Sequence, residues 1–252
     1  MESTISIQKA IEQKSGKVKL RGWCYRERGS NNLILIVLRD SSNIIQCVLE
    51  KKAVSEEIWK DAKKIKIETS LEIEGTIKED ARAPTGFEVL IDDIKIIGLC
   101  ENYPIQKDLS KEFLADKRHL WLRSRKMTSI LKIRSTVFGA IHNYFRSKDF
   151  YEYHSPIFQP TQAEGGSSVF ELPYFGKKIY LAQTWQLQAE PAIFALERIY
   201  TIAPSFRAEK SVTSRHLTEY WHAEMEEAWT NFNELQDHSE ALVKNIVKVK
   251  NR

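Results

Sequence analysis

Short apolar stretches that alternate with polar positions, broken by turn residues, run from residue 17 to residue 97. Alternation with a period of two is typical of β-strands, because successive side chains of a strand point to opposite faces. The segment 54–64 (VSEEIWKDAKK) instead has its apolar residues at helical spacing. We therefore expect one short helix between two groups of strands, which cover 17–26, 33–39, 43–49, 69–77 and 87–97.

Three strands, one helix and two further strands in this order are typical of a small five-stranded Greek-key barrel, the OB-fold. Barrels of this kind often bind oligonucleotides on one face, so a nucleic-acid partner is one interpretation of residues 1–100. A structural or protein-contact module is the other interpretation, because a fold does not by itself define a function. The pattern of apolar positions leaves both open.

Periodicity is lost between residues 98 and 110, where Pro104 also interrupts any regular element. A chain of 252 residues exceeds the usual size of a single domain and can bury two separate cores. We expect a barrel domain over 1–100, a linker over 101–110 and a second domain over 111–252.

The second domain opens with a long amphipathic segment, RKMTSILKIRSTVFGAIHNYFRSKDF, at 125–150. Its apolar residues fall on one helical stripe, which predicts a helix packed on other elements; they are Met127, Ile130, Leu131, Val137, Phe138, Ile141, Tyr144 and Phe145. Strands are expected near 150–154, 178–183, 198–206 and 217–229, with helices near 186–196 and 232–250. This order predicts an α+β domain, an antiparallel sheet with helices packed on it.

Composition indicates the cellular compartment in which we expect the protein, but it does not identify a binding partner. No run approaches the roughly 20 apolar residues that a membrane span needs, and the first residues lack the pattern of a secretory signal, so we expect a cytoplasmic protein. The three cysteines, Cys24, Cys47 and Cys100, are odd in number and lack metal-ligand spacing, which predicts reduced thiols. The net charge of +4 permits a polyanionic partner but does not require one.

Charged side chains are dense between Phe206 and Tyr220, where two apolar strands flank Arg207, Glu209, Lys210, Arg215, His216 and Glu219. A guanidinium group offers a planar fork of donors that suits phosphate oxygens, and a neighbouring carboxylate can hold it in position. The alternative is a solvated hairpin with surface ion pairs, which contribute little stability. Composition does not choose between the two, whereas the order of residue types does.

That order, SFRAEK…RHLTEYWHAE from Ser205 to Glu224, resembles motif 2 of the class II aminoacyl-tRNA synthetases. The motif has an aromatic residue, Arg, any residue and Glu, followed by a loop and Arg-His. The segment 149–158 (DFYEYHSPIF) is similar to motif 1, with its proline at Pro156, and 113–126 (FLADKRHLWLRSRK) is similar to the lead-in of the aspartyl and asparaginyl branch. The resemblance covers nearly the whole chain, and it implies an aminoacyl-tRNA ligase with an anticodon-binding OB-fold barrel followed by a class II catalytic domain.

The resemblance implies an ATP site at motif 2. Arg207 is expected to bind the α-phosphate and to stabilise charge as the amino acid's carboxylate attacks it. Glu209, the second implied catalytic residue, is expected to contact the nucleotide or the terminal adenosine of the tRNA. Arg215 and His216 are expected at the outer phosphates, and Tyr220 is expected to stack on adenine.

The resemblance also implies an amino-acid pocket lined by Glu164, Gln183, Gln186, Ala189 and Glu224. Glu164, in the loop AEGGSS, is expected to bind the α-amino group, and the two glycines of that loop make it a plausible lid. In the segment QTWQLQAE, Ala189 stands where aspartyl enzymes have a lysine that pairs with the substrate carboxylate, so an aspartate side chain would lose its charge partner. Glu224 would accept a hydrogen bond from a carboxamide and repel a carboxylate. Both features favour asparagine, unless Ala189 is a core residue and another cation replaces the lysine.

In the barrel, the resemblance places Gln46 at the middle base of the anticodon and Glu88 near the first base. Arg21 and Arg26 are expected to contact backbone phosphates. Leu35 stands where relatives have a base-stacking aromatic residue, and stacking on a ring is worth roughly 1 to 3 kcal/mol. We therefore expect either weaker anticodon binding or another ring, such as Trp23, in its place.

The implied partners are tRNA(Asn), asparagine and a second copy of the chain bound through the motif 1 region, with ATP and Mg²⁺ as cofactors. The glycine-rich third motif of the family, with its arginine for the γ-phosphate, is not found in the sequence, nor are the acids expected to hold Mg²⁺. We therefore expect a catalytic domain that is incomplete at its C-terminus and a 252-residue chain that forms no adenylate by itself.

Three other interpretations remain open. The first is a non-catalytic paralogue that binds tRNA or protein, and the second is an aspartyl-tRNA synthetase. The third is a synthetase-like asparagine synthetase, but those relatives resemble the catalytic domain alone, so the complete barrel counts against it.

Overall fold

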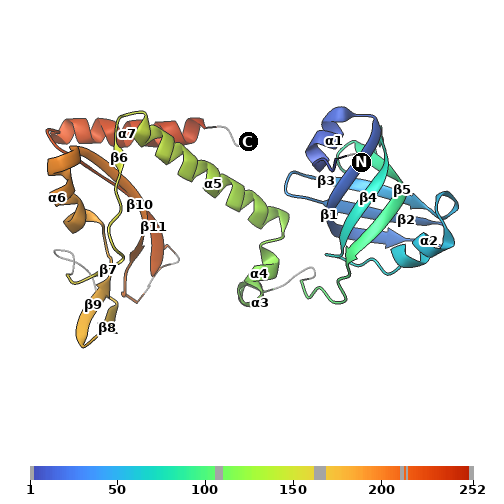
Figure 1. Cartoon of the computed structure of the whole chain (residues 1–252), viewed down its shortest axis with the longest axis horizontal. Helices are drawn as coiled ribbons and strands as arrows, with labels where there is room; N and C mark the ends of the chain where they lie inside the picture. The colour runs from blue at the N-terminus through green and yellow to red at the C-terminus, as the bar shows by residue number, and fades with distance from the viewer. Residues whose placement is uncertain (1–2, 106–109, 162–168, 211–212, 214, 250–252) are drawn as a thin grey trace. The chain divides into compact units, whose positions relative to one another are not determined.

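The computed structural model describes residues 3–105, 110–161, 169–210, 213 and 215–249. The chain forms two compact units, Met1–Ser124 and Arg125–Arg252 (Figure 1). The first unit extends past residue 100 because it includes two short helices after the barrel, α3 (Lys111–Asp116) and α4 (Arg118–Trp121). The division into functional domains stays a prediction.

The first unit contains a closed barrel with its strands in the order β1-β2-β3-β5-β4. The strands are β1 (Gly16–Gly29), β2 (Leu33–Arg39), β3 (Ile44–Glu50), β4 (Ser70–Glu79) and β5 (Phe87–Gly98), and a 3-10 turn (Lys51–Ala53) and α2 (Glu56–Ala62) lie between β3 and β4. The expected OB-fold is therefore confirmed. The ends of each predicted strand lie within three residues of those observed.

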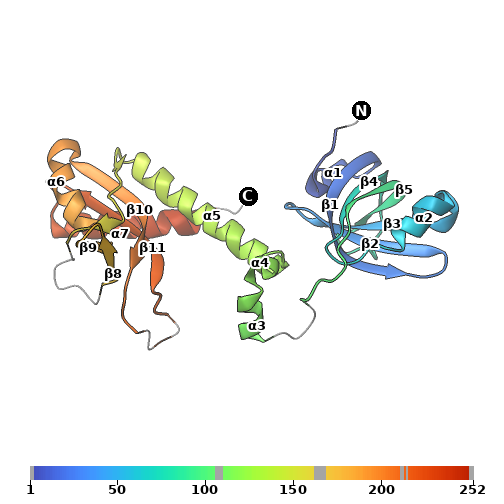
Figure 2. The same cartoon turned by 60° about the horizontal axis from the view of Figure 1, so that its bottom comes forward.

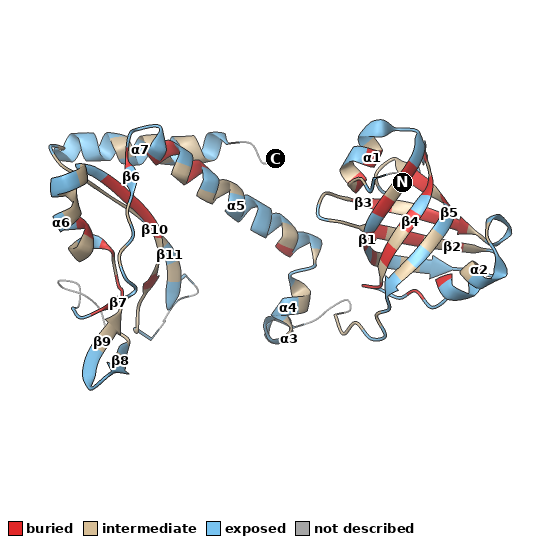
Figure 3. Ribbon diagram, in the orientation of Figure 1, coloured by how far each residue is buried: buried red, intermediate tan, exposed pale blue. Residues whose placement is uncertain are grey.

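Alternation along the strands fills the interior of the barrel. In β2, Ile34, Ile36 and Leu38 are buried while the residues between them are half-exposed. Figure 3 shows buried segments on all strands of the barrel. Trp59 of α2 completes this core with only 2% of its surface exposed. A period of two thus separates an apolar inner face from an outer face that is free to bind a partner.

A helix that the sequence pattern does not predict, α1 (Ile7–Gln13), precedes the barrel. Ser6 caps it by accepting a hydrogen bond from the N–H of Lys9, and the N–H of Ile7 donates to Asp40 at 2.8 Å. Only Ile7 and Ala10 are buried, both in the barrel core. Two buried residues in seven form no recognisable stripe, which explains why periodicity misses this helix.

Two glycines allow neighbouring strands of the barrel to approach closely. A Cβ atom at Gly22 would collide with the carbonyl oxygen of Arg39, and one at Gly75 would collide with that of Leu90. Gly75 also lies at an irregularity in the pairing of β4 with β5. These positions require glycine because of space rather than backbone angle.

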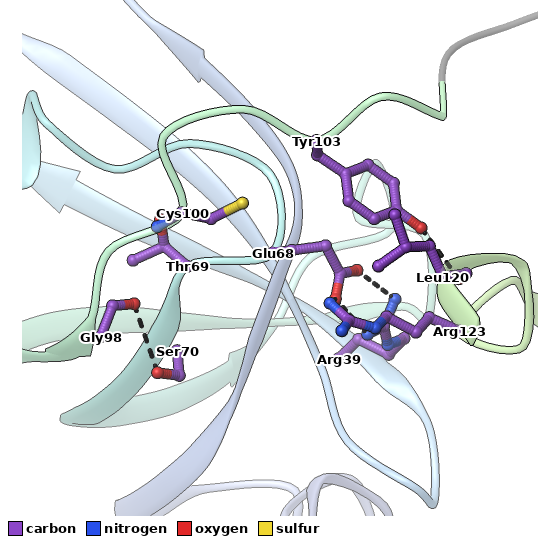
Figure 4. A network of polar contacts seen from close by, with 9 residues as sticks. All are labelled: Arg39, Glu68, Thr69, Ser70, Gly98, Cys100, Tyr103, Leu120 and Arg123. Carbon is purple, nitrogen blue, oxygen red and sulfur yellow. Dashed lines mark hydrogen bonds and ion pairs between the residues drawn. The ribbon is translucent and has the colours of Figure 1, made fainter. Parts of the chain in front are cut away.

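A buried carboxylate, Glu68, joins the barrel to the segment after α4 (Figure 4). Both of its oxygens accept from the guanidinium of Arg39, at 2.8 and 3.1 Å, and one also accepts from Arg123 at 3.1 Å. The Tyr103 hydroxyl donates to the carbonyl of Leu120 at 3.1 Å. These contacts fix residues 118–123 against the barrel and explain why the first unit ends at Ser124.

The described residues of the second unit form two small sheets and three helices, whose arrangement can be followed in Figure 2. The sheets have the strand orders β11-β10-β6 and β7-β9-β8. The elements are α5 (Arg125–Arg146), β6 (Tyr151–Glu152), β7 (Phe158–Gln159), β8 (Glu171–Tyr174), β9 (Lys177–Leu181), α6 (Gln186–Leu196), β10 (Arg198–Phe206), β11 (Glu219–Glu227) and α7 (Phe232–Lys248). The expected α+β class is confirmed, although β6 is shorter than predicted and pairs with β10 in parallel.

The two faces of the β10–β11 hairpin meet different helices. Tyr200, Ile202 and Met225 pack against α5 and α7. Ile199, which points the other way, packs against Trp185 and α6. Because residues directly opposite each other share a face, the α6 side of β11 carries every second residue from Tyr220 to Glu226. This side is the face on which the candidate site lies.

Candidate functional site

A regular hairpin forms the frame of the site. β10 and β11 pair antiparallel without interruption from Arg198 opposite Glu227 to Phe206 opposite Glu219. The N–H of Arg207 donates to the carbonyl of Thr218 at 2.9 Å, which continues the ladder into the loop. The charged loop therefore begins after Arg207 and ends before Thr218, where the two strands are still paired.

The five residues predicted to bind ATP surround one cavity of about 590 Å³. Its lining is Arg207, Glu209, Lys210, Arg215, His216, Leu217 and Tyr220. These residues include two arginines and one lysine but only one carboxylate, that of Glu209. The described lining of the cavity therefore has a net positive charge. Such a cavity suits the oxygens of a polyphosphate.

Short contacts between the residues that line the cavity hold their side chains in place. Arg207 donates from Nε to the hydroxyl of Tyr220 at 3.3 Å, which ties the arginine to β11. Thr213 lies 2.6 Å from Nδ1 of His216 through its hydroxyl, which also accepts from the N–H of Arg215 at 3.3 Å. Thr213 thus contacts both Arg215 and His216, the two residues expected at the outer phosphates.

A second polar group lies further along the same face, at Glu224. The segment between β9 and α6 runs beside the end of β10, where the N–H of Phe206 donates to the carbonyl of Ala182 at 2.9 Å. This places the Thr184 hydroxyl against one oxygen of Glu224 and the N–H of Trp185 at 3.2 Å from the other. Glu224 lies four positions after Tyr220, roughly 13 Å along the strand.

The pKa values of Glu224 and of Glu226, two residues further along β11, shift in opposite directions. Burial raises the pKa of Glu224, but hydrogen bonds from His222 and Thr184, the charge of His222 and the N–H of Trp185 outweigh it, so the pKa lies below its ordinary value. Burial raises the pKa of Glu226, and the charges of Glu190 and Glu224 raise it further. The donors around Glu224 therefore favour its ionised form.

The other predicted pocket residues lie on and just before α6. Gln183 is buried, and Gln186 donates from its side chain to Glu190 at 3.0 Å. Ala189 is completely buried in the small cluster that includes Trp185. The environment of Ala189 is therefore that of a core residue, which the sequence left as an alternative, and a lysine there would need new space. Glu164 lies outside the described residues.

The structure brings four of the five predicted anticodon residues into one region of the barrel. Arg26 lies opposite Val37, which lies opposite Gln46, which lies opposite Glu88, so these residues form a row across four strands. Gln46 donates to Glu88 at 2.9 Å. Leu35 is two residues from Val37 and therefore on the same face.

The fifth predicted residue, Arg21, lies apart from this row. It pairs with β4, where its Nε is 2.6 Å from Glu72. Trp23 lies opposite Arg39, four residues along β2 from Leu35, or roughly 13 Å. A ring at Trp23 therefore does not occupy the place of Leu35.

Several residues of the site were not singled out from the sequence. They are Thr184, Ser205, His222 and Glu226. Alternation along β11 would have placed His222 and Glu226 on the face of Glu224. The positions of Thr184 and Ser205 depend on contacts between segments that are distant in the sequence. No local sequence pattern predicts such contacts.

Neither a metal cluster nor a membrane helix is found in the part of the chain that the structure describes. No three His, Cys, Asp or Glu side chains within it are arranged to hold a metal ion. No helix within it is long and apolar enough to cross a membrane.

Family models match both halves of the chain. A model described as tRNA synthetases class II (D, K and N) matches residues 110–252, and one described as an OB-fold nucleic acid binding domain matches residues 18–97. An asparagine–tRNA ligase of Thermoplasma acidophilum is 48% identical over 92% of this chain and 54% of the relative. That of Thermococcus kodakarensis is 46% identical over 94% of this chain and 55% of the relative.

Solved structures are similar over nearly the whole chain. Asparaginyl-tRNA synthetase from Pyrococcus horikoshii complexed with asparaginyl-adenylate has a TM-score of 0.92 at 38% identity, over 98% of this chain and 58% of that one. The Entamoeba histolytica asparaginyl-tRNA synthetase has a TM-score of 0.87 at 31% identity, over 98% of this chain and 58% of that one. The chain spans about half the length of the curated relatives it matches.

Proposed function

This chain belongs to the class II tRNA synthetases of the D, K and N group, and we propose that it is part of an asparagine–tRNA ligase. Such an enzyme activates asparagine with ATP and transfers it to tRNA(Asn). Curated relatives with 46 to 48% identity are named for this activity, and a structural neighbour with a TM-score of 0.92 is complexed with asparaginyl-adenylate.

One observation about the described site supports the proposal most directly. The same face of β11 meets a cationic cavity at Tyr220 and presents an oriented carboxylate at Glu224, roughly 13 Å further along the strand. An aminoacyl-adenylate needs both, because a nucleotide and an amino-acid side chain extend in opposite directions from the phosphate where they join. The hairpin thus offers a binding surface for both ends of one ligand.

Charge and position explain how the cavity would promote adenylate formation. Arg207, held by Tyr220, would bind the α-phosphate and stabilise the negative charge that grows as the carboxylate attacks. Arg215 and His216 would bind the outer phosphates, which leave as pyrophosphate, and Tyr220 would stack on adenine. Glu209 would contact the nucleotide or the terminal adenosine. No covalent intermediate with the protein is required, since positioning and electrostatics suffice.

The amino-acid end would discriminate by hydrogen-bond chemistry. Glu224 is ionised, so it accepts from the N–H of a carboxamide and repels a second carboxylate. Gln183, Gln186 and Ala189 would shape the surrounding wall, and Glu164 would bind the α-amino group. Asparagine is therefore favoured over aspartate.

The barrel would bind the anticodon through the row from Arg26 to Glu88, with Leu35 beside it and Arg21 outside it. This assigns residues 1–100 to tRNA recognition, 101–110 to the linker and 111–252 to catalysis. The enzyme would act in the cytoplasm as a homodimer through the motif 1 region.

Mg²⁺ would accompany ATP, but the described residues do not fit it as a resident ion. Magnesium prefers several carboxylate and phosphate oxygens. Glu209 is the only carboxylate among the described residues that line the cavity, and those residues include no cluster of three metal-ligating side chains. The phosphate oxygens of the nucleotide would supply much of its coordination.

ATP–pyrophosphate exchange tests the function. We expect no exchange from the 252-residue chain alone. A chimera in which the chain is continued by the unmatched C-terminal part of the Thermoplasma acidophilum relative should exchange pyrophosphate with asparagine far better than with aspartate. Arg207→Ala in the chimera should reduce the rate at least about 100-fold.

Arg134→Ala, on the exposed face of α5, is the matched control and should keep the full rate. The proposal fails if the folded chimera prefers aspartate, or if Arg207→Ala is as active as the control.

A further inference from the structure

A chain of polar side chains extends from β10 to the carboxylate of Glu224. Nδ1 of His222 lies 3.2 Å from the hydroxyl of Ser205 and 3.2 Å from one oxygen of Glu224. Ser205 is almost completely buried, with 2% of its surface exposed. The Thr184 hydroxyl contacts the other oxygen of Glu224. None of Ser205, His222 and Thr184 has a role in the function proposed above.

We propose that His222 is a positioning residue that holds Glu224 as an ionised and oriented acceptor, and thereby sets the preference for a carboxamide side chain over a carboxylate. The inference rests on the proposed function, in which Glu224 accepts a hydrogen bond from the side chain of the substrate amino acid. His222 acts through Glu224 and need not touch the substrate.

The geometry determines which ring nitrogen of His222 has the proton. Nδ1 has either one N–H or one lone pair in the ring plane. A lone pair would accept from Ser205 but would face the negative oxygen of Glu224 at 3.2 Å, which is repulsive. An N–H carries a partial positive charge that attracts this oxygen even while it is shared with the Ser205 hydroxyl, so this is the favourable arrangement. Nδ1 therefore has the proton.

Counting donors shows what remains available on Glu224. A carboxylate has about four acceptor sites on its two oxygens. The N–H of Trp185 and Nδ1 of His222 use the sites of one oxygen, and Thr184 uses one site of the other. One acceptor site is left, which matches a single N–H of a carboxamide. A ligand carboxylate has no hydrogen to donate to this site and is repelled by the negative charge of Glu224.

The neighbouring acids make this arrangement necessary. Glu226 follows two residues later on the same face, and Glu190 approaches from α6. The negative charges of Glu190 and Glu224 both act on Glu226 and disfavour its ionised form. Because His222, Thr184 and Trp185 all donate to Glu224, the negative charge stays there, and Glu226 is the acid whose pKa rises.

Nuclear magnetic resonance of the 252-residue chain tests the proposal without any activity. Ring ¹⁵N shifts identify the tautomer of His222, and side-chain ¹³C shifts follow the titration of Glu224, with Glu224→Gln to assign the signal. We expect a proton on Nδ1 at neutral pH and a Glu224 pKa below its ordinary value. His222→Leu should move that pKa upward.

Two further variants separate positioning from a general structural effect. His222→Asn places an amide N–H where Nδ1 stands and should restore the low pKa of Glu224. Ser205→Ala removes the competing partner of Nδ1 and should leave that pKa low.

A neutral His222 protonated only on Nε2 would overturn the proposal, and this measurement needs no variant to fold. An unchanged Glu224 titration in His222→Leu would also overturn it. If the titrations behave as expected but the chimera shows no asparagine-dependent exchange, the network stands and the proposed function fails.

Discussion

Removing the buried carboxylate of Glu68 should destabilise the barrel more than any surface ion pair could. Its side chain is 3% exposed and that of its main partner, Arg39, is 13% exposed, so Glu68→Ala would leave a guanidinium buried without its acceptor. Breaking a buried pair by removing one partner costs about 3 to 5 kcal/mol. The contact with Arg123 adds less, because the arginine is 42% exposed and water replaces the carboxylate.

The matched control is Asp92→Ala. Asp92 pairs with Lys17 at 2.6 Å, but both side chains are more than half exposed, and such pairs contribute about 0 to 1 kcal/mol. Replacing Glu68 and Arg39 together by methionine should recover most of the loss, because no buried charge is then left unpaired.

Native-state hydrogen exchange of amides in β3 and β4 is the suitable assay, because it reports the opening of the barrel separately from the second unit. Urea titration followed by tryptophan fluorescence, to which the buried Trp59 contributes with five other tryptophans, gives a second measure. The reasoning is refuted if Glu68→Ala lowers the free energy of opening by no more than Asp92→Ala does. It is also refuted if the double methionine variant is less stable than Glu68→Ala.

Three further outcomes are expected. Gly139→Ala, in the exposed middle of α5 with no atom near its new Cβ, should stabilise the second unit by about 1 kcal/mol in urea titration; a loss of stability would contradict this. Iodoacetamide should modify Cys100 but spare Cys24 and Cys47 in the folded chain, since burial raises the pKa of both thiols, that of Cys24 to about 12; mass spectrometry would show any early second adduct. The lowered pKa of Glu224 stabilises the fold above its unfolded value of about 4.3, and this contribution is lost as the pH falls through the lower folded value. Unfolding free energies measured from pH 6 to 3 should therefore depend less on pH in Glu224→Gln.

Elements with a strong local pattern could be predicted from the sequence. β2 has the bounds expected for its short apolar run, LILIVLR, and α6 has the expected bounds of 186–196. By contrast, α1 buries only two residues, and β6 is a strand only through its short pairing with β10. Those two elements depend on tertiary contacts, which the local periodicity of the sequence does not predict.

The candidate site likewise has a part that could be predicted from the sequence and a part that could not. The charges that surround the cavity occur in one continuous segment, so their order along the chain was enough to bring Arg207 and Tyr220 into the prediction. Two of the donors to Glu224 come from Thr184 and Trp185, about forty residues away, and their positions depend on the bond between Phe206 and Ala182. The burial of Ala189 likewise follows from the packing of α6 on β10.

The position of β11 at the margin of its sheet has a consequence for the behaviour of the chain in solution. Among the described residues it pairs on one side only, with β10, so a nine-residue edge is left with open backbone donors and acceptors. Trp221 on this strand is about half exposed. Long uncovered edges act as templates for the addition of further strands, and proteins usually shield them. Where neither a further segment of a longer protein nor another polypeptide covers this edge, self-association and aggregation through β11 would compete with ligand binding on the same strand.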